Sequence, residues 1–295
     1  MTTMTRRISV TVAHDHLLQL VKSPKTGIFE LVWNALDADA KRVEISFRRN
    51  STGSLESLVI VDDGTGITEE RAESQFEKLG DSWKARAHVS DGGRKLHGER
   101  GRGRWAAYGL GTTAVWDSIA ERVTGDMRRV RILGDKSDLR TFEVDADQAG
   151  ADQRSGTTVI VSNPTDAAVK YFESSAPFTD LSIEYAAYIE HYGVAISFDG
   201  EEIRPKTLQE RSEIVVLTVP EATPPTAQLR IVEWKIDVPR KLYLCDPSGV
   251  VLYDMRAGIQ APSFNFTGYL QWENFRDHES LLILEQGAPT PGASH

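Results

Sequence analysis

Residues Lys25 to Ala40, KTGIFELVWNALDADA, constrain the fold more than any other stretch of the chain. Their apolar side chains recur at three- and four-residue spacing, which predicts a helix with one face packed on a core. Glu30, Asn34 and Asp37 stand beside that face within a narrow arc, because a helix has about 3.6 residues per turn. Two carboxylates and a carboxamide so aligned can hold a hydrated cation and orient a water molecule. A solvated polar face also explains them.

A second motif, Asp62-Asp63-Gly64-Thr65-Gly66-Ile67, begins where a predicted buried strand at 58–61 ends. Alternate glycines let the backbone turn tightly and let a flat ligand approach it closely. The carboxylate of Asp62 at the strand end is suited to accept a hydrogen bond from a buried donor, such as an exocyclic amine. Asp-Gly turns are common in proteins, so this motif alone is a weak indication of function.

Residues 84 to 104 form a basic, glycine-rich stretch with seven Lys or Arg residues and two acidic ones. Gly98, Gly101 and Gly103 precede an apolar pattern that predicts a helical region ending at 115–121. Free backbone N–H groups and the positive end of the helix dipole would make this junction an anion site. The spacing matches neither the Walker pattern nor a dinucleotide-binding fingerprint. A flexible loop explains the glycines but not their combination with arginines, so we favour phosphate binding.

Composition restricts the classes of function. Hydrophobic residues make up 40% and charged residues 26% of the 295 residues, as in ordinary globular proteins. The net charge of −9 provides no overall basic field for nucleic acid or acidic membranes. No apolar run is long enough for a membrane span, and the start of the chain lacks a signal-peptide pattern. The single cysteine, Cys245, excludes an intrachain disulfide and fits a reducing cytoplasm.

The order of predicted elements indicates an α+β fold with two domains. Helices alternate with buried strands up to Asn163-Pro164, and a predicted helix at 179–191 then precedes a hairpin and a strand-rich region. We therefore expect a two-layer α/β sandwich at residues 1–170 and a smaller, mixed, strand-rich domain at 171–284. Residues 285–295 have the composition of a disordered tail.

With these motifs in order, the sequence resembles the GHKL superfamily of ATP-binding proteins. That superfamily includes DNA gyrase B, heat-shock chaperones of the ninety-kilodalton class, sensor histidine kinases, MutL and MORC proteins. Its first box, a Glu followed by Asn-Ala and Asp-Ala, is complete here from Glu30 to Ala38. Its second box is Asp62-x-Gly64-x-Gly66.

The glycine-rich end of the family's nucleotide lid is matched at 98–103, and a late Gly-Thr pair is matched by Gly156-Thr157. The motifs cover residues 15 to 165. Beyond them, the layout is similar to the transducer domain of MutL, gyrase and MORC proteins, and looks most like the MORC version. The histidine kinase branch fits poorly, because it lacks such a second domain. The arginine-rich lid departs from the common pattern.

The resemblance implies a role for each matched residue. Glu30 would be the general base that activates water, and Asn34 would ligate Mg²⁺ between the phosphates. Asp62 would accept the adenine amino group, with Thr157 acting through water, while Asp37 would orient the helix or reach the base. The glycines would contact the nucleotide directly. The remaining positions expected to bind ATP are Gly64, Gly66, Ile67, Lys84, Gly98, Arg100, Gly101, Arg102 and Gly103.

The resemblance also implies an activity and partners. We expect slow, Mg²⁺-dependent hydrolysis of ATP to ADP, which drives lid closure and homodimerisation in a clamp or motor. A lysine of the second domain, Lys235 or Lys241, would reach the γ-phosphate. Such a motor would act with a protein partner or with DNA in a larger machine, for example in defence, and without a membrane. The alternatives are a nucleotide-sensing binding module without useful turnover and a GHKL-type protein kinase.

Overall fold

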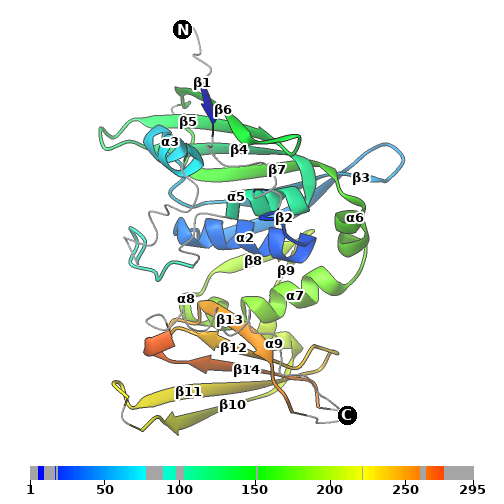
Figure 1. The fold of residues 1–295 in the computed structure, drawn as a ribbon, viewed down its shortest axis with the longest axis vertical. Helices are drawn as coiled ribbons and strands as arrows, with labels where there is room; N and C mark the ends of the chain where they lie inside the picture. The colour runs from blue at the N-terminus through cyan, green and yellow to red at the C-terminus, as the bar shows by residue number, and fades with distance from the viewer. Residues whose placement is uncertain are drawn as a thin grey trace. The chain divides into compact units, whose positions relative to one another are not determined.

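The computed structural model describes residues 6–9, 17, 19–77, 89–97, 103–150, 152–220, 222–259 and 264–275. The chain forms two compact units (Figure 1). The first contains the residues up to Leu181 together with Gly193–Ile203, and the second contains Ser182–Tyr192 and the residues from Arg204 onward. The hairpin at 195–202, which we expected in the second domain, belongs to the first unit because its strand β8 pairs with β2.

The first unit is built on a nine-stranded sheet in the order β1-β6-β5-β4-β7-β3-β2-β8-β9. Neighbouring strands are antiparallel except for β2 and β8, which run parallel. The strands are β1 (Arg6–Ser9), β2 (Arg42–Arg49), β3 (Leu55–Asp62), β4 (Gly111–Glu121), β5 (Met127–Asp135), β6 (Asp138–Gln148), β7 (Gly156–Pro164), β8 (Ala195–Phe198) and β9 (Glu201–Glu202).

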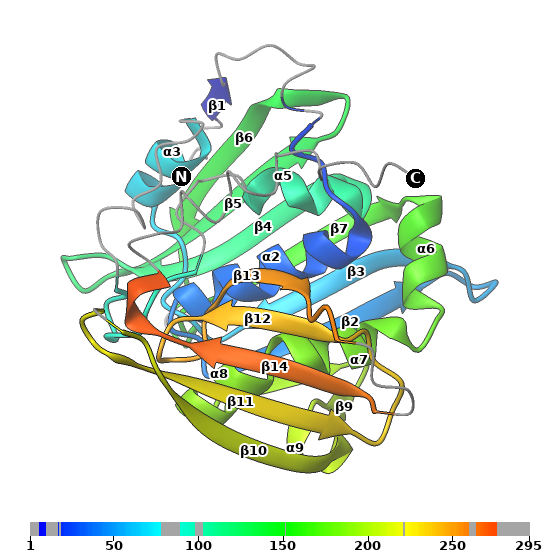
Figure 2. The same ribbon diagram turned by 60° about the horizontal axis from the view of Figure 1, so that its bottom comes forward.

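Helices cover one face of this sheet (Figures 1 and 2). They are α2 (Pro24–Asp37), α3 (Glu69–Glu77), α5 (Gly103–Ala106) and the 3₁₀ turn η1 (Ala107–Gly109). Trp105 of α5 and Phe76 of α3 both make edge-to-face contacts with Phe142 of β6, and Phe76 makes another with Trp116 of β4. These rings form the aromatic part of the core between the helices and the sheet.

The segment after Gly103 differs from the prediction. We expected a helical region that ends at 115–121, but the helix α5 and the turn η1 end at Gly109 and are followed by the long strand β4. The side chains of β4 alternate between buried and half-exposed positions, and Ala114, Trp116 and Ser118 lie on the buried face. This two-residue period belongs to a strand with one covered face.

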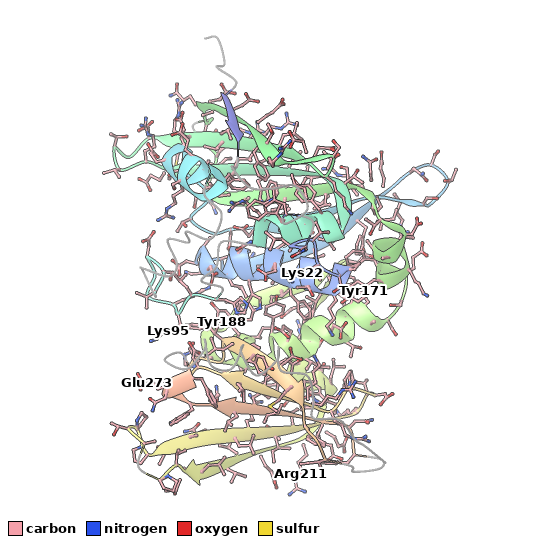
Figure 3. All side chains as sticks on the ribbon, in the orientation of Figure 1. Lys22, Lys95, Tyr171, Tyr188, Arg211 and Glu273 are labelled. Atoms are coloured by element: carbon pink, nitrogen blue, oxygen red, sulfur yellow. The ribbon has the colours of Figure 1, made fainter. Side chains whose placement is uncertain are left out.

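Two short helices continue the first unit after β7. They are α6 (Asp166–Phe172) and α7 (Ala176–Glu184), and α7 runs on into the second unit. The hydroxyl of Tyr171, which is labelled in Figure 3, donates to the carboxylate of Asp180 at 3.0 Å. Lys25 at the start of α2 donates to the same carboxylate at 2.5 Å. The expected single helix at 179–191 is two helices, α7 and α8 (Ala186–Tyr192), with Tyr185 between them.

The second unit contains a five-stranded sheet in the order β10-β11-β14-β12-β13. Here β12 and β14 are parallel, and the other neighbours are antiparallel. The hydroxyl of Tyr269 in β14 donates to the carbonyl of Ile183 at the end of α7, and Gly249, which precedes β13, lies against Ala187 of α8. The elements are α9 (Pro205–Leu208), β10 (Gln209–Thr218), β11 (Thr226–Trp234), β12 (Lys241–Cys245), β13 (Val251–Arg256), β14 (Phe266–Gln271) and η2 (Glu273–Phe275).

We expect Phe142→Ala to lower the free energy of unfolding of the first unit by about 3–5 kcal/mol. Phe142 is fully buried and contacts three other aromatic rings, so its removal leaves a cavity that the rigid sheet cannot close. Urea unfolding followed by circular dichroism measures this change. Val123→Ala, at a fully exposed turn, is the control and should change stability by less than about 0.5 kcal/mol. Equal effects of the two substitutions would contradict the assigned core.

Candidate nucleotide site

Helix α2 begins at Pro24, where a proline is tolerated because the first helical N–H has no partner within the helix. The side chain of Ser23 caps this end by accepting a hydrogen bond from the amide of Thr26 at 3.2 Å. The face with Ile28, Leu31, Val32, Ala35 and Leu36 is buried, as the apolar spacing predicts. Glu30 and Asn34 are half-buried, as expected for polar groups at the margin of the buried face.

Gly103 lies directly against this polar pair. A Cβ atom at position 103 would be 2.8 Å from Oε2 of Glu30 and 3.3 Å from Nδ2 of Asn34. Only a residue without a side chain fits there unless Glu30 moves. The end of the glycine-rich stretch and two residues of the first motif therefore meet in space, although about 70 residues separate them in the chain.

The third polar residue of α2, Asp37, is buried and has a structural contact. Its Oδ1 accepts a hydrogen bond from the backbone amide of His97 at 2.7 Å. The imidazole of His97 stacks on the indole of Trp33, with 4.3 Å between the ring centroids. Asp37 and Trp33 thus hold His97, the residue that immediately precedes Gly98.

Asp39, which no sequence motif singled out, holds Ser90 and Gly92 in the same way. Its carboxylate accepts hydrogen bonds from the hydroxyl of Ser90 at 2.5 Å and from the amide of Gly92 at 2.7 Å. Arg94 adds a hydrogen bond from its guanidinium to the carbonyl of Ala40 at 2.6 Å. Asp39 has a positive φ of 62°, a left-handed conformation that aspartate adopts more readily than most residues.

Residues 89–97 are therefore anchored on the C-terminal end of α2. Val89 and Lys95 form an isolated antiparallel bridge within this segment, and Lys95 is labelled in Figure 3. Leu96 is buried, which adds an apolar contact to the polar ones. The segment is basic in composition, yet three of its polar contacts are to carboxylates at the end of α2. These contacts hold the middle of the glycine-rich stretch in place.

Asp62, Thr157 and Ser118 form a row across three adjacent strands. Asp62 of β3 is paired in register with Thr157 of β7, and Thr157 is paired with Ser118 of β4. Directly opposed residues of antiparallel neighbours project from the same face of a sheet. Ser118 shares the helix-covered face with Trp116, so the whole row lies on that face. The sequence predicted Asp62 and Thr157, whereas Ser118 was missed because no motif contains it.

The carboxyl group of Asp62 has an unusual affinity for protons. Burial raises its pKa to about 6, although hydrogen bonds from the backbone of Gly64 and Thr157 lower the pKa and partly oppose this effect. The amide of Gly64 donates to Oδ1 of Asp62 at 2.9 Å. At pH 7 the group is then roughly nine-tenths ionised and can accept further hydrogen bonds, because a carboxylate offers about four lone-pair positions.

The glycines of the second motif lie where no side chain would fit. A Cβ atom on Gly64 would be 2.6 Å from the carbonyl oxygen of Ala38, and one on Gly66 would be 2.1 Å from that of Ile119. Gly66 also has a φ of +74°, which favours glycine. The amide of Ile67 then donates to Oγ of Ser118 at 2.8 Å. The loop is thus pressed between the end of α2 and strand β4.

The comparison with protein families agrees with this arrangement. Residues 22–143 match the family model described as histidine kinase-, DNA gyrase B- and HSP90-like ATPase. The chain carries a GHKL-type ATPase domain. The matched range includes α2, the DGTGI motif and residues 89–97 and 103–143, and Thr157 lies beyond it. No curated protein matches the chain.

Some predicted site residues of the ATPase domain lie outside the described residues. They are Lys84, Gly98, Arg100, Gly101 and Arg102. The two candidate lysines of the second unit are described: Lys235 donates to the carbonyl of Thr207 at 3.2 Å, and Lys241 pairs with Asp254. Their predicted role at the γ-phosphate stays a prediction. In the part of the chain that the structure describes, no helix is long and apolar enough to cross a membrane.

The described residues fit a magnesium ion that is held mainly by its nucleotide. No group of three or more His, Cys, Asp and Glu side chains among them is arranged to hold a metal by itself. Mg²⁺ in nucleotide sites usually takes one or two protein oxygens and completes its shell with phosphates and water. Asn34 offers one carboxamide oxygen next to Glu30 and Gly103, so the ATPase domain suits that mode of binding.

We expect Asp62→Asn to stabilise the first unit more at pH 7.5 than at pH 4.5. The folded-state pKa of about 6 lies above the ordinary aspartate value of 3.8, so the folded state binds the proton more tightly than the unfolded state. The stability that this proton provides is complete at low pH and is lost as pH rises through about 6. The side chain of asparagine does not titrate, so Asp62→Asn does not lose this stability as pH rises through about 6.

Urea unfolding of the wild type and of Asp62→Asn at the two pH values measures the difference in their free energies of unfolding. Groups elsewhere in the chain titrate equally in both proteins and cancel in that difference. A difference that stays constant between pH 4.5 and pH 7.5 would contradict the raised pKa.

Proposed function

We propose that the chain is a slow, Mg²⁺-dependent ATPase in which Glu30 activates the attacking water. The observation that carries this proposal is the close packing of Gly103 against Glu30. A Cβ atom at position 103 would lie 2.8 Å from the Glu30 carboxylate. A glycine-rich backbone with its N–H groups is a favourable phosphate ligand. Its proximity to a carboxylate and a carboxamide assembles the parts that phosphoryl transfer to water needs.

Each described residue has a distinct task in this proposal. The carboxylate of Glu30 takes a proton from water, and Asn34 holds Mg²⁺, which would neutralise charge on the phosphates. Asp62 accepts a hydrogen bond from the amino group of adenine. Gly64 and Gly66 leave the backbone bare, so that the base can lie against it.

Asp37 serves the site indirectly. We propose that it sets the position from which the phosphate-binding glycines begin, because its carboxylate holds the amide of His97. The sequence suggested that Asp37 orients the helix or reaches the base; its hydrogen bond to the amide of His97 supports a structural role, because it joins the end of α2 to residues 89–97. The carboxylate of Asp39 supports the same segment through Ser90 and Gly92.

We further propose that nucleotide binding closes the glycine-rich segment and promotes homodimerisation, and that the second unit transmits the change to a protein partner or to DNA. The division of the chain into two compact units supports a motor with a separate output part. Slow turnover would suit such a device, because hydrolysis then sets how long the closed state lasts. Either Lys235 or Lys241 is the proposed contact from the second unit to the γ-phosphate.

We expect Glu30→Gln to reduce the steady-state rate of phosphate release about 100-fold or more, because the amide cannot take a proton from water. The substitution keeps the size of the side chain, so the affinity for ADP should change less than about threefold. Phosphate release is measured with Mg-ATP, and ADP affinity by calorimetry. Glu56→Gln, on an exposed position of β3, is the control and should leave both unchanged.

The outcomes separate the proposal from its alternatives. Turnover by the wild type and not by Glu30→Gln supports the ATPase. Nucleotide binding without turnover by either protein supports a binding module that switches partner affinity. Transfer of labelled phosphate to protein, in place of its release, would indicate a kinase. Equal turnover of the wild type and Glu30→Gln would refute the role of Glu30 as base.

We expect Gly103→Ala to reduce ATP turnover at least about tenfold, because the new methyl group would displace Glu30 or the backbone, and small displacements of catalytic groups cost one to two orders of magnitude. Gly150→Ala is the matched control: the nearest atom to its Cβ position is 3.6 Å away, so alanine fits there. Unchanged turnover in Gly103→Ala would mean that the close approach has no part in catalysis.

A further inference from the structure

Strand β10 forms one edge of the five-stranded sheet, and no strand of the described ranges pairs with its outward side (Figures 1 and 2). Every residue from Glu210 to Thr218 is exposed. Four consecutive large apolar residues have high exposed fractions, which are 64% for Ile214, 41% for Val215, 63% for Val216 and 36% for Leu217. Successive residues of a strand project from opposite faces of a sheet. The edge therefore presents apolar side chains on both faces.

The other sheet edges formed by described strands have features that prevent pairing with another chain. Protected edges are usually short, charged or interrupted by a bulge. In the first unit, β9 consists of Glu201 and Glu202, and β1 has four residues with two arginines. In the second unit, β13 ends with the charged residues Asp254 and Arg256, and its pairing with β12 contains a register shift. Strand β10 is ten residues long and has no charge, proline or bulge from Ile214 onward.

The pairing of β10 with β11 determines which backbone groups of β10 point outward. The amide of Val219 donates to the carbonyl of Pro225 at 2.7 Å, next to the registered pair of Thr218 and Thr226. Hydrogen-bonded and non-hydrogen-bonded pairs alternate along an antiparallel ladder. The odd-numbered residues of β10 therefore bond to β11. The N–H and C=O groups that point away from β11 belong to Ser212, Ile214, Val216 and Thr218.

We propose that β10 pairs with β10 of a second copy of the chain, antiparallel and about a two-fold axis at Val215. Two second units would then share one continuous sheet. In this register Ile214 faces Val216 of the other copy, and Ser212 faces Thr218. All four residues have outward backbone groups, so the contact provides about eight backbone hydrogen bonds. Pairs of β-branched side chains and Ser–Thr pairs are favourable across strands.

The axis at Val215 gives better-matched pairs than its two neighbours. An axis at Ile214 would place the polar Ser212 against the apolar Val216. An axis at Val216 would place Ser212 opposite Pro220, which has no N–H to donate. Only the axis at Val215 matches apolar with apolar and hydroxyl with hydroxyl through the outward-pointing residues.

A second copy is the occupant that this edge fits, because self-pairing closes. The two-fold contact uses the free edge of both copies and leaves none for a third chain. An apolar edge that stays open is instead a template for aggregation. The contact lies in the second unit and involves no nucleotide. It is therefore separate from the nucleotide-promoted homodimer proposed above.

Sedimentation of the full-length chain without nucleotide tests this contact. One strand pair buries a small interface, so we expect a dimer with a dissociation constant of about 1–100 μM. Val216→Pro should weaken it at least about tenfold, because proline removes an outward N–H without breaking the ladder to β11. Val216→Thr is the matched control: it keeps the N–H and the branched side chain, and should change the constant less than about fivefold. Circular dichroism and urea unfolding verify that the variants are folded.

A charge-pair experiment tests the axis itself. Val215→Lys alone and Val215→Glu alone would each place like charges opposite each other, which should weaken the dimer at least about fivefold. Mixing the two variants in equal amounts should restore association, because lysine then faces glutamate. A fluorescent label on one variant detects the mixed dimer during sedimentation.

Three outcomes would overturn the proposal. They are a wild type that stays monomeric up to about 200 μM, well above the expected constant, a folded Val216→Pro that dimerises like the wild type, and a mixture that associates no better than its two components. None of these outcomes bears on the ATPase proposed for the first unit, which phosphate release measures separately.

Discussion

The close packing of α2 against residues 103–110 is the constraint on which the first unit depends. Three glycines make it achievable. A Cβ atom on Gly27 would be 2.7 Å from the carbonyl oxygen of Ala106, one on Gly109 would be 2.2 Å from that of Lys22, and one on Gly103 would touch Glu30. The two backbones thus meet without intervening side chains. This contact holds the polar residues of α2 beside the end of the glycine-rich stretch and lays the helix on the sheet.

The candidate site combines this close backbone contact with a buried carboxyl group, that of Asp62. Burial makes ionisation of Asp62 unfavourable, and two backbone hydrogen bonds recover only part of that cost. A ligand that donates to this carboxylate would recover more of it. Asp37 and Asp39 have the opposite arrangement, since hydrogen bonds from residues 90–97 occupy their carboxylates. The carboxylates at the end of α2 and the carboxylate at the end of β3 thus serve two purposes, and their hydrogen-bond partners distinguish them.

Local sequence patterns predicted much of this structure. The periodicity of α2 and the strand that leads into Asp62 are present, because each depends on neighbours within one element. The order of predicted helices and strands also indicated the α+β class. Strand β4 was wrongly assigned to a helical region, since small residues such as Ala114 and Ala120 carry little strand signal and the alternation is visible only once one face is covered. Ser118 could not be predicted, because its importance comes from strands that pair across long separations. Asp39 was missed for the same reason, because its partners lie about 50 residues further along the chain.

The position of β7 has a consequence for synthesis of the chain on the ribosome. It lies between β3 and β4 in the sheet, although it follows both in sequence. A nascent chain that ends before Gly156 therefore contains Glu30, Asp62 and Ser118 but lacks the strand that joins them. Because proteins are made from the N-terminus, the nucleotide site proposed above is complete only after β7 has been inserted. Cellular ATP would then stabilise only finished copies of the sheet and provide no support to shorter, partly translated chains.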